Sequence, residues 1–95
     1  MRITQVVWTD NDVEHIAQHG VDPDEVEQVI ASRPVWRRGR RHVETGRQSL
    51  YALGRTDAGR YLFVVLSPVG QGRARCVTAR EMDNLTRRYY QRHRR

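Results

Sequence analysis

The stretch LGRTDAGRYLFVVL, residues 53–66, predicts a β-hairpin, and this hairpin decides the fold. Before the turn, RQSLYALGR (47–55) alternates between apolar and polar residues, as a half-buried strand does. After it, RYLFVVLSP (60–68) carries apolar residues on both faces, which is typical of a central strand. The TDAG segment between them has the composition of a tight turn. Two long antiparallel strands are therefore expected at the centre of a sheet.

The next segment, RARCVTARE (73–81), predicts a third strand of this sheet after a PVGQG turn. Side chains alternate along a strand, so Ala74, Cys76 and Thr78 are expected on one inward-looking face, with Arg80 at its end. Arginine is almost never fully buried without a partner. Arg80 is therefore expected to meet a carboxylate, the solvent or an anionic ligand, and it is the first candidate for function.

The first third of the chain predicts a strand and two helices. ITQVVW (3–8) alternates and is rich in β-branched residues, and Thr9 then offers an N-cap for a helix that Gly20 ends. In VDPDEV (21–26), Asp22 caps a second helix, Pro23 takes its first position, and Glu25 completes a capping box. Pro34 ends this helix.

The remaining segments complete the order β-α-α-β-β-β-β-α. VWRRGRRHV (35–43) predicts a basic edge strand or loop anchored by Trp36. A last helix is expected from about residue 81 to residue 92, with Met82, Leu85 and Tyr89 facing the core. This order implies an α+β fold in which helices pack on an antiparallel β-sheet.

Length and composition indicate one small domain spanning residues 1–95. No apolar run reaches the ~18 residues of a membrane span, and the N-terminus lacks the apolar core of a signal peptide. The single cysteine, Cys76, lies in an apolar strand and has no internal partner for a disulfide. These features predict a cytoplasmic protein that does not bind membranes.

The charge is strongly segregated along the chain. Residues 1–30 contain seven acidic residues and one arginine, whereas residues 31–95 contain sixteen arginines and four acidic residues. A basic region of this kind is the electrostatic footprint of phosphate-backbone binding. An acidic protein partner is the alternative that the charge pattern leaves open.

Arginines near strand ends are the candidates for phosphate contacts. Arg55 and Arg60 flank the TDAG turn and Arg80 ends the last strand, so these three are expected to form one cluster with the WRRGRRH segment (36–42). Tyr90 in the last helix is expected to stack on a base, about 100° from Tyr89 around the helix. The predicted RNA-binding residues are Arg37, Arg38, Arg40, Arg41, Arg55, Arg75, Arg87 and Tyr90.

Other chemistries have little support in the sequence. His15 and His19 have the four-residue spacing of a two-histidine metal site, but no third ligand follows at a telling interval. Phosphate-binding glycine loops, GxSxG motifs and paired-cysteine metal sites are missing from the sequence. No metal and no cofactor are therefore expected, and His19 is a candidate for proton transfer.

Taken together, these segments resemble the BrnT family of ribonuclease toxins from type II toxin–antitoxin modules. The resemblance runs through Trp8, HGV (19–21), the acidic VDPDEVEQV (21–29), Arg47, the hairpin, and TAR (78–80), and ends in a helix with Met82 and Tyr90. The family usually has a lysine where this chain has Gln18, and an ER pair where it has Thr86 and Arg87.

The resemblance implies a RelE-like fold and a metal-independent endoribonuclease that inhibits translation. It implies a small antitoxin, expected to be of the ribbon-helix-helix type, in a hetero-oligomer, with a toxin homodimer as a further option. It also implies that Arg80, Arg47 and Arg60 contact the scissile phosphate, with His19 as proton carrier. A non-catalytic nucleic-acid-binding or partner-binding module remains the alternative.

Overall fold

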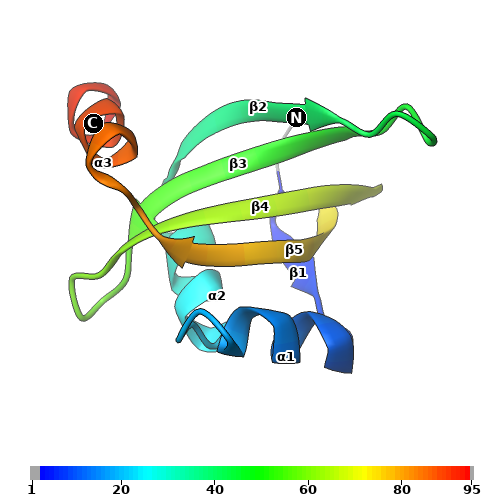
Figure 1. Ribbon diagram of the computed structural model, residues 1–95, viewed down its shortest axis with the longest axis horizontal. Helices are drawn as coiled ribbons and strands as arrows, with labels where there is room; N and C mark the ends of the chain where they lie inside the picture. The colour runs from blue at the N-terminus through cyan, green and yellow to red at the C-terminus, as the bar shows by residue number, and fades with distance from the viewer. Residues whose placement is uncertain (1–2, 95) are drawn as a thin grey trace.

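The computed structural model describes residues 3–94, which form five strands and three helices (Figure 1). The bounds of these elements are β1 (Gln5–Val7), α1 (Asp10–Ala17), α2 (Pro23–Ala31), β2 (Val35–Arg41), β3 (Gln48–Arg55), β4 (Tyr61–Gly70), β5 (Arg73–Glu81) and α3 (Asn84–His93). The predicted α+β class and element order are confirmed. No helix among these elements is long and apolar enough to cross a membrane.

The five strands form one sheet in the order β1-β5-β4-β3-β2. β2, β3, β4 and β5 pair antiparallel with their neighbours, whereas the short β1 pairs parallel with β5. The sheet is therefore mostly antiparallel rather than wholly so. β2 lies at one edge, as the basic composition of residues 35–43 predicts.

The predicted central hairpin is present, with Leu53 opposite Phe63 and Arg55 opposite Tyr61. Its turn is held by Thr56, whose backbone N–H donates to the Arg60 carbonyl at 2.9 Å and whose hydroxyl accepts from the Arg60 N–H at 3.0 Å. Gly59 has φ +89°, a conformation that a side chain would strain. This explains why a glycine follows Asp57 and Ala58 in the turn.

Helices α1 and α2 cover one face of the sheet, which we call the helix-side face (Figure 1). Both start at the predicted caps, since the Thr9 hydroxyl accepts from the Asp12 N–H and Asp22 forms the full capping box with Glu25. Their buried side chains, Ile16, Val26 and Val29, pack in one core cluster with strand residues that include Ala52, Leu62, Val64, Leu66 and Cys76. Burial raises the pKa of the Cys76 thiol to about 12, which makes this thiol an inert part of the core.

A β-bulge in β5 corrects the predicted orientation of Arg80. Cys76 pairs with Leu66 and Thr78 pairs with Val65, so Val77 is an extra residue without an opposite partner. The alternation therefore shifts by one position after Val77: Ala79 is fully buried, whereas Arg80 is exposed opposite Phe63. The prediction that Arg80 continues the inward face of Ala74 and Cys76 is wrong.

The last helix also differs from its prediction. β5 continues through Glu81, and Asp83 then caps α3 by accepting a hydrogen bond from the Thr86 N–H at 2.7 Å. Leu85 is 74% exposed, whereas Tyr90 is 9% exposed and packs edge-on against Tyr61 with ring centroids 5.9 Å apart. The buried face of α3 is therefore the Tyr90 face, and Tyr90 is not free to stack on a base as predicted.

One of the predicted RNA contacts, Arg75, is instead paired with α1. Its Nε and Nη2 donate to the two carboxylate oxygens of Asp12 at 3.2 and 2.8 Å. The Asp12 side chain is only 7% exposed, and the hydrogen bond from Arg75 lowers the pKa of its carboxyl group. This bidentate pair fastens the first turn of α1 to β5.

We expect Asp12→Asn to lower the free energy of unfolding by roughly 1.5–3 kcal/mol near pH 7, the amount typical of a hydrogen bond to a charged group. The pKa of Asp12 is lowered in the folded state, so its ionised carboxylate stabilises the fold at pH values above the ordinary pKa of 3.8. This stabilisation is lost as the pH falls through the lowered pKa. The difference in melting temperature between wild type and variant should therefore shrink below about pH 4. Glu14→Gln, at an exposed position of α1, is the control, and a pH-independent difference for Asp12→Asn would contradict the ion-pair explanation.

Candidate nucleic-acid interface

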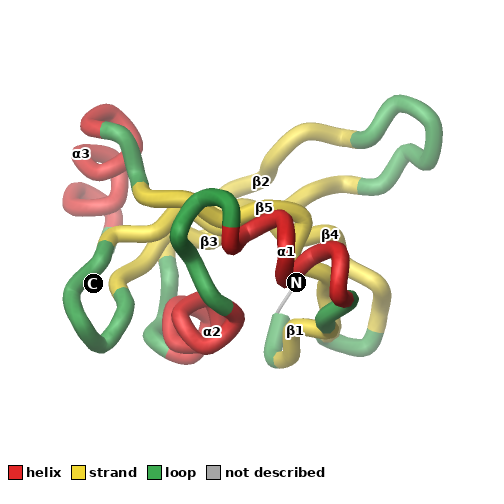
Figure 2. The backbone as a smooth tube through the Cα atoms, turned by 60° about the horizontal axis from the view of Figure 1, so that its bottom comes forward, coloured by secondary structure: helices red, strands yellow, loops and turns green. Residues whose placement is uncertain are grey.

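The opposite face of the sheet, which we call the open face, combines arginines with aromatic rings. Strand pairing places Arg37 beside Tyr51, Arg55 beside Tyr61, and Arg80 beside Phe63. These positions alternate with Leu62 and Val64, which lie in the core beneath α1 and α2, so their side chains lie on the opposite face. Of the three helices, α3 is the one on this side, near the end of β5 (Figures 1 and 2). The site is defined by Arg37, Tyr51, Arg55, Tyr61, Phe63, Arg80, Arg87, Tyr89 and His93.

The centre of the open face is an aromatic pair with a cation above it. Tyr51 and Phe63 pack edge-to-face with centroids 4.8 Å apart, and the Arg80 guanidinium carbon lies 4.8 Å from the Phe63 centroid. Within residues 3–94, Arg80 forms no ion pair with a carboxylate. Its charge is therefore held in place by stacking while its N–H donors stay open to an anionic ligand.

Gly39 makes the position of the Tyr51 ring possible. A Cβ atom at residue 39 would lie 2.8 Å from Cζ and 2.9 Å from Cδ1 of Tyr51, closer than real side chains approach. The ring therefore lies directly over the β2 backbone. The backbone of β2 at Gly39 therefore helps to hold the Tyr51 ring in place.

A second group forms where α3 meets the sheet. The Tyr61 ring lies under the guanidinium groups of Arg55 and Arg87, whose carbons are 4.9 and 3.9 Å from its centroid. The pKa of Tyr61 is lowered, first by a hydrogen bond from Arg87 and further by Gln91 and the charge of Arg55. Two cations are thus gathered around one phenol.

The rim of the open face carries a histidine with a defined tautomer. Arg37 lies 4.2 Å from the Tyr89 centroid, and His93 stacks on the same ring at 3.9 Å. The His93 Nδ1 lies 2.8 Å from the Tyr89 carbonyl oxygen, and a carbonyl only accepts. Nδ1 therefore carries the proton, and in the neutral ring Nε2 is left free to accept one.

Arg60, predicted to contact the phosphate, is instead a tie between elements on the helix side. Its Nη1 donates to the Gly20 carbonyl at 3.0 Å and to both carboxylate oxygens of Glu25 at 2.8 and 2.7 Å, and Nη2 donates to Glu81 at 3.1 Å. These partners, with the Glu25 hydrogen bond first, raise the pKa of Arg60. Its donors are engaged in joining the hairpin turn to α2 and to the end of β5.

The predicted cluster of phosphate contacts does not form as one group. Arg47 precedes β3 and Arg60 follows it, so the eight residues of that strand, about 26 Å at ~3.3 Å each, separate them. Arg38 and Arg41 line a hollow with Leu50 and Pro68, and Arg38 pairs with Leu50 on the helix-side face. Arg40 is exposed in β2. Arg37, Arg55, Arg80 and Arg87 are the predicted or candidate arginines that the fold brings together.

His19 lies away from the open face, near the end of α1. It is exposed, and its ring is 5.6 Å from that of His15, which hydrogen-bonds to the Thr78 hydroxyl at 3.2 Å. In the described part of the chain, no three histidine, cysteine or acidic side chains come together as metal ligands. The structure therefore offers His93, rather than His19, as the histidine next to the arginines.

The comparisons with known proteins identify the family. A family model described as "Ribonuclease toxin, BrnT, of type II toxin-antitoxin system" matches residues 8–85. The chain belongs to the BrnT family. Its fold is similar to the crystal structure of the Brucella abortus ribonuclease toxin BrnT, with a TM-score of 0.58 and 18% identity over 85% of this chain and 99% of that one. Among curated proteins, no sequence matches the chain.

Family membership indicates which ligands to consider for the open face. A toxin of a type II system implies a cognate antitoxin, and a ribonuclease toxin implies an RNA substrate. Arginines over aromatic rings suit RNA because guanidinium groups bind phosphates and rings stack on bases. The BrnT family model ends at residue 85, so Arg87, Tyr89 and His93 lie outside the matched region.

Four residues of the site are not predicted from the sequence: Tyr51, Tyr61, Phe63 and His93. The alternation in RYLF places Tyr61 and Phe63 on the face opposite Leu62, and this signal was available in the sequence. It was masked because β4 is apolar on both faces, as central strands often are. The stacking of His93 on Tyr89 depends on the phase of α3, which the sequence alone misassigns.

We expect Arg87→Ala to raise the pKa of Tyr61 toward its ordinary value, because the variant removes the hydrogen bond that lowers it most. Nuclear magnetic resonance of ring-labelled tyrosines would follow the Tyr61 titration. Arg88→Ala removes an equal charge from the neighbouring exposed position and is the matched control. An equal shift in both variants would show that general charge, and not the Arg87 contact, sets the pKa.

Proposed function

We propose that this BrnT-family chain is a metal-independent endoribonuclease toxin that binds and cuts RNA on its open face. The family match carries the assignment to ribonuclease toxins, and the cluster of Arg37, Arg55, Arg80 and Arg87 over aromatic rings supports the location. Cutting messenger RNA in the cytoplasm would inhibit translation. The antitoxin would be a small ribbon-helix-helix protein that forms a hetero-oligomer with this chain.

The chemistry needs few protein groups. The 2′-hydroxyl oxygen of the RNA attacks the adjacent phosphorus while its proton passes to a general base. The P–O5′ bond breaks to leave a 2′,3′-cyclic phosphate, and the leaving 5′-oxygen takes a proton from water. Arg80 would stabilise the charge that develops on the phosphate, since its donors are unpaired within residues 3–94 and its position over Phe63 is fixed. Nε2 of His93 would accept the proton.

The other candidates take supporting roles in this proposal. Arg55 and Arg87 would hold flanking phosphates, Tyr51 and Phe63 would stack on bases, and Arg37 would position the RNA near His93. Arg60 and Tyr90 would act indirectly, by fixing the hairpin turn and the seat of α3. Arg40 and Arg47 would contact RNA that extends beyond the open face.

Purified wild-type protein should cut RNA in the presence of EDTA. The variant Arg80→Lys should cut RNA about 10²- to 10³-fold more slowly than wild type, which is the usual effect of removing one transition-state donor. Lysine retains the charge but not the planar fork, so RNA affinity should change much less than the rate. The melting temperature of Arg80→Lys should stay close to that of wild type, since no carboxylate in residues 3–94 pairs with Arg80. Tight RNA binding without any cleavage by wild type would favour a non-catalytic binding module.

His93→Gln should reduce cleavage by roughly 10²-fold or more, in the range of lost general-base catalysis, while the RNA affinity stays near wild type. His19→Gln is the control, because His19 is exposed near the end of α1 and away from the arginine cluster. If His19→Gln has the larger effect, the proton carrier belongs on α1, and the assignment of His93 is wrong.

A further inference from the structure

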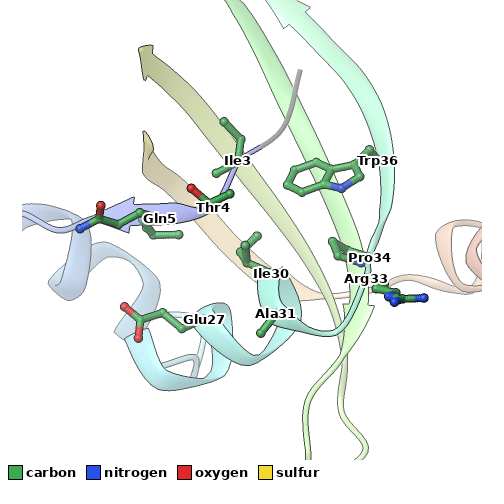
Figure 3. Close-up of a pocket in the computed structure, with 10 residues that line it drawn as sticks. Ile3, Thr4, Gln5, Glu27, Ile30, Ala31, Arg33, Pro34 and Trp36 are labelled. Atoms are coloured by element: carbon green, nitrogen blue, oxygen red, sulfur yellow. The ribbon is translucent and has the colours of Figure 1, made fainter. Parts of the chain in front are cut away.

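A groove runs beside β2 on the helix-side face, where α1 and α2 leave the sheet uncovered (Figure 3). Its first part, with a volume of about 710 Å³, lies between the N-terminal segment and α2 and is lined by Ile3, Ile30, Pro34 and Trp36. Its second part, about 410 Å³, is lined by Trp36, Leu50 and Pro68. Because Trp36 borders both parts, they form one surface, the Trp36 groove.

The Trp36 groove exposes apolar surface that the fold itself does not need. Trp36 is 36% exposed, and its indole extends from β2 toward Ile3 above Ile30 (Figure 3). Ile30 and Leu50 form the floor of the groove, and both are partly buried and pack against the core cluster. The core therefore holds the floor of the groove in place. A concave apolar surface with an exposed tryptophan is typical of a protein-binding site, and aliphatic side chains give nucleic-acid bases little to recognise.

Charges around the groove select the partner. Its first part is bordered by Arg33 and by Glu27, whose carboxylate accepts a hydrogen bond from the Trp8 indole N–H at 3.0 Å. Its second part is bordered by Arg37, Arg38 and Arg41, so arginines outnumber the single carboxylate. β2 holds four arginines among its seven residues and is an edge strand, so a second copy paired along this edge would bring like charges together. An acidic segment along the same edge would instead bring carboxylates next to these arginines. Arginines flanking apolar hollows therefore fit a chain that carries apolar side chains between acidic ones.

We propose that the Trp36 groove is the anchor site of the antitoxin, which binds there through an acidic segment lying along β2 with apolar side chains in the groove. This inference rests on the proposed function in that the occupant is the antitoxin. Backbone groups on the free edge of β2 are available for strand addition. The anchor lies on the face opposite Arg80. The bound segment would pass Arg37, which borders the second part of the groove and belongs to the open face, so a partner bound at the groove would obstruct RNA there.

The test uses the full chain and, as the probe, the small protein encoded by the adjacent reading frame. Trp36→Ala and Arg38→Glu should each weaken the complex by at least about 10-fold, as loss of a central interface contact does. Arg88→Glu on exposed α3 is the matched charge reversal and should leave the affinity unchanged. Trp36→Ala should cut RNA like wild type but resist inhibition by the probe protein.

Fluorescence of Trp36 provides a second readout of binding. The chain has two tryptophans, so Trp8→Phe leaves Trp36 as the reporter. This variant loses the hydrogen bond from Trp8 to Glu27 at the groove, so its affinity for the probe protein is measured beside that of wild type. Adding the probe protein should shift its emission to shorter wavelength and protect it from acrylamide. Unchanged Trp36 emission, wild-type affinity in both groove variants, or no complex with wild type would overturn the proposal.

Two further outcomes separate this proposal from its alternatives. If Trp36→Ala and Arg38→Glu weaken binding of a single-stranded RNA as much as binding of the probe protein, the groove is an RNA site and the docking proposal fails. If wild type forms the Trp36-dependent complex but cuts no RNA, the ribonuclease assignment fails while the docking site stands.

Discussion

The β-bulge at Val77 decides which face of the sheet carries Arg80, and the two-sided design of the molecule depends on it. If β5 had no bulge and all its residues alternated regularly from Ala74 and Cys76, Arg80 would point into the apolar core beneath α1 and α2. An unpaired charge there would cost several kcal/mol. The bulge instead places Ala79 in the core, where a small side chain fits, and Arg80 over Phe63. The bulge thus has two effects: it buries the small side chain of Ala79 in the core, and it places the Arg80 guanidinium on the open face.

Six of the arginines fall into two groups according to where the carboxylates lie. The acidic residues of 1–30 belong to α1, α2 and their caps, and Asp12 and Glu25 capture Arg75 and Arg60. On the open face, Arg37, Arg55, Arg80 and Arg87 lie over aromatic rings instead. A ring holds a guanidinium in place without neutralising its charge, so stacking keeps these cations available for phosphates. The acidic residues of the first third thus pair with two arginines on the helix side, and the four stacked arginines keep their donors on the open face.

The sequence predicts what local interactions determine. The capping box of Asp22 and Glu25 and the TDAG turn involve residues three or four apart, and both are found as predicted. The face of Arg80 could not be read from RARCVTARE because the bulge is a property of its pairing with β4. The phase of α3 likewise follows from the contact between Tyr90 and Tyr61, which lie far apart in the chain. The sequence therefore predicts that the site consists of arginines from the second half of the chain, but it predicts only some of the residues that make up the site.

β2 is the element that links the two faces. Adjacent residues of a strand point to opposite sides, so Trp36 lines the groove on the helix-side face while Arg37 reaches Tyr89 on the open face. The same strand has a free edge, since β3 is its neighbour on one side of the sheet order and the other side ends there. A chain pairing with that edge would alternate in the same way and meet both faces at once. If the antitoxin binds the Trp36 groove and RNA binds the open face as we propose, the geometry of this edge strand would place the two sites within one residue of each other, close enough for one ligand to exclude the other.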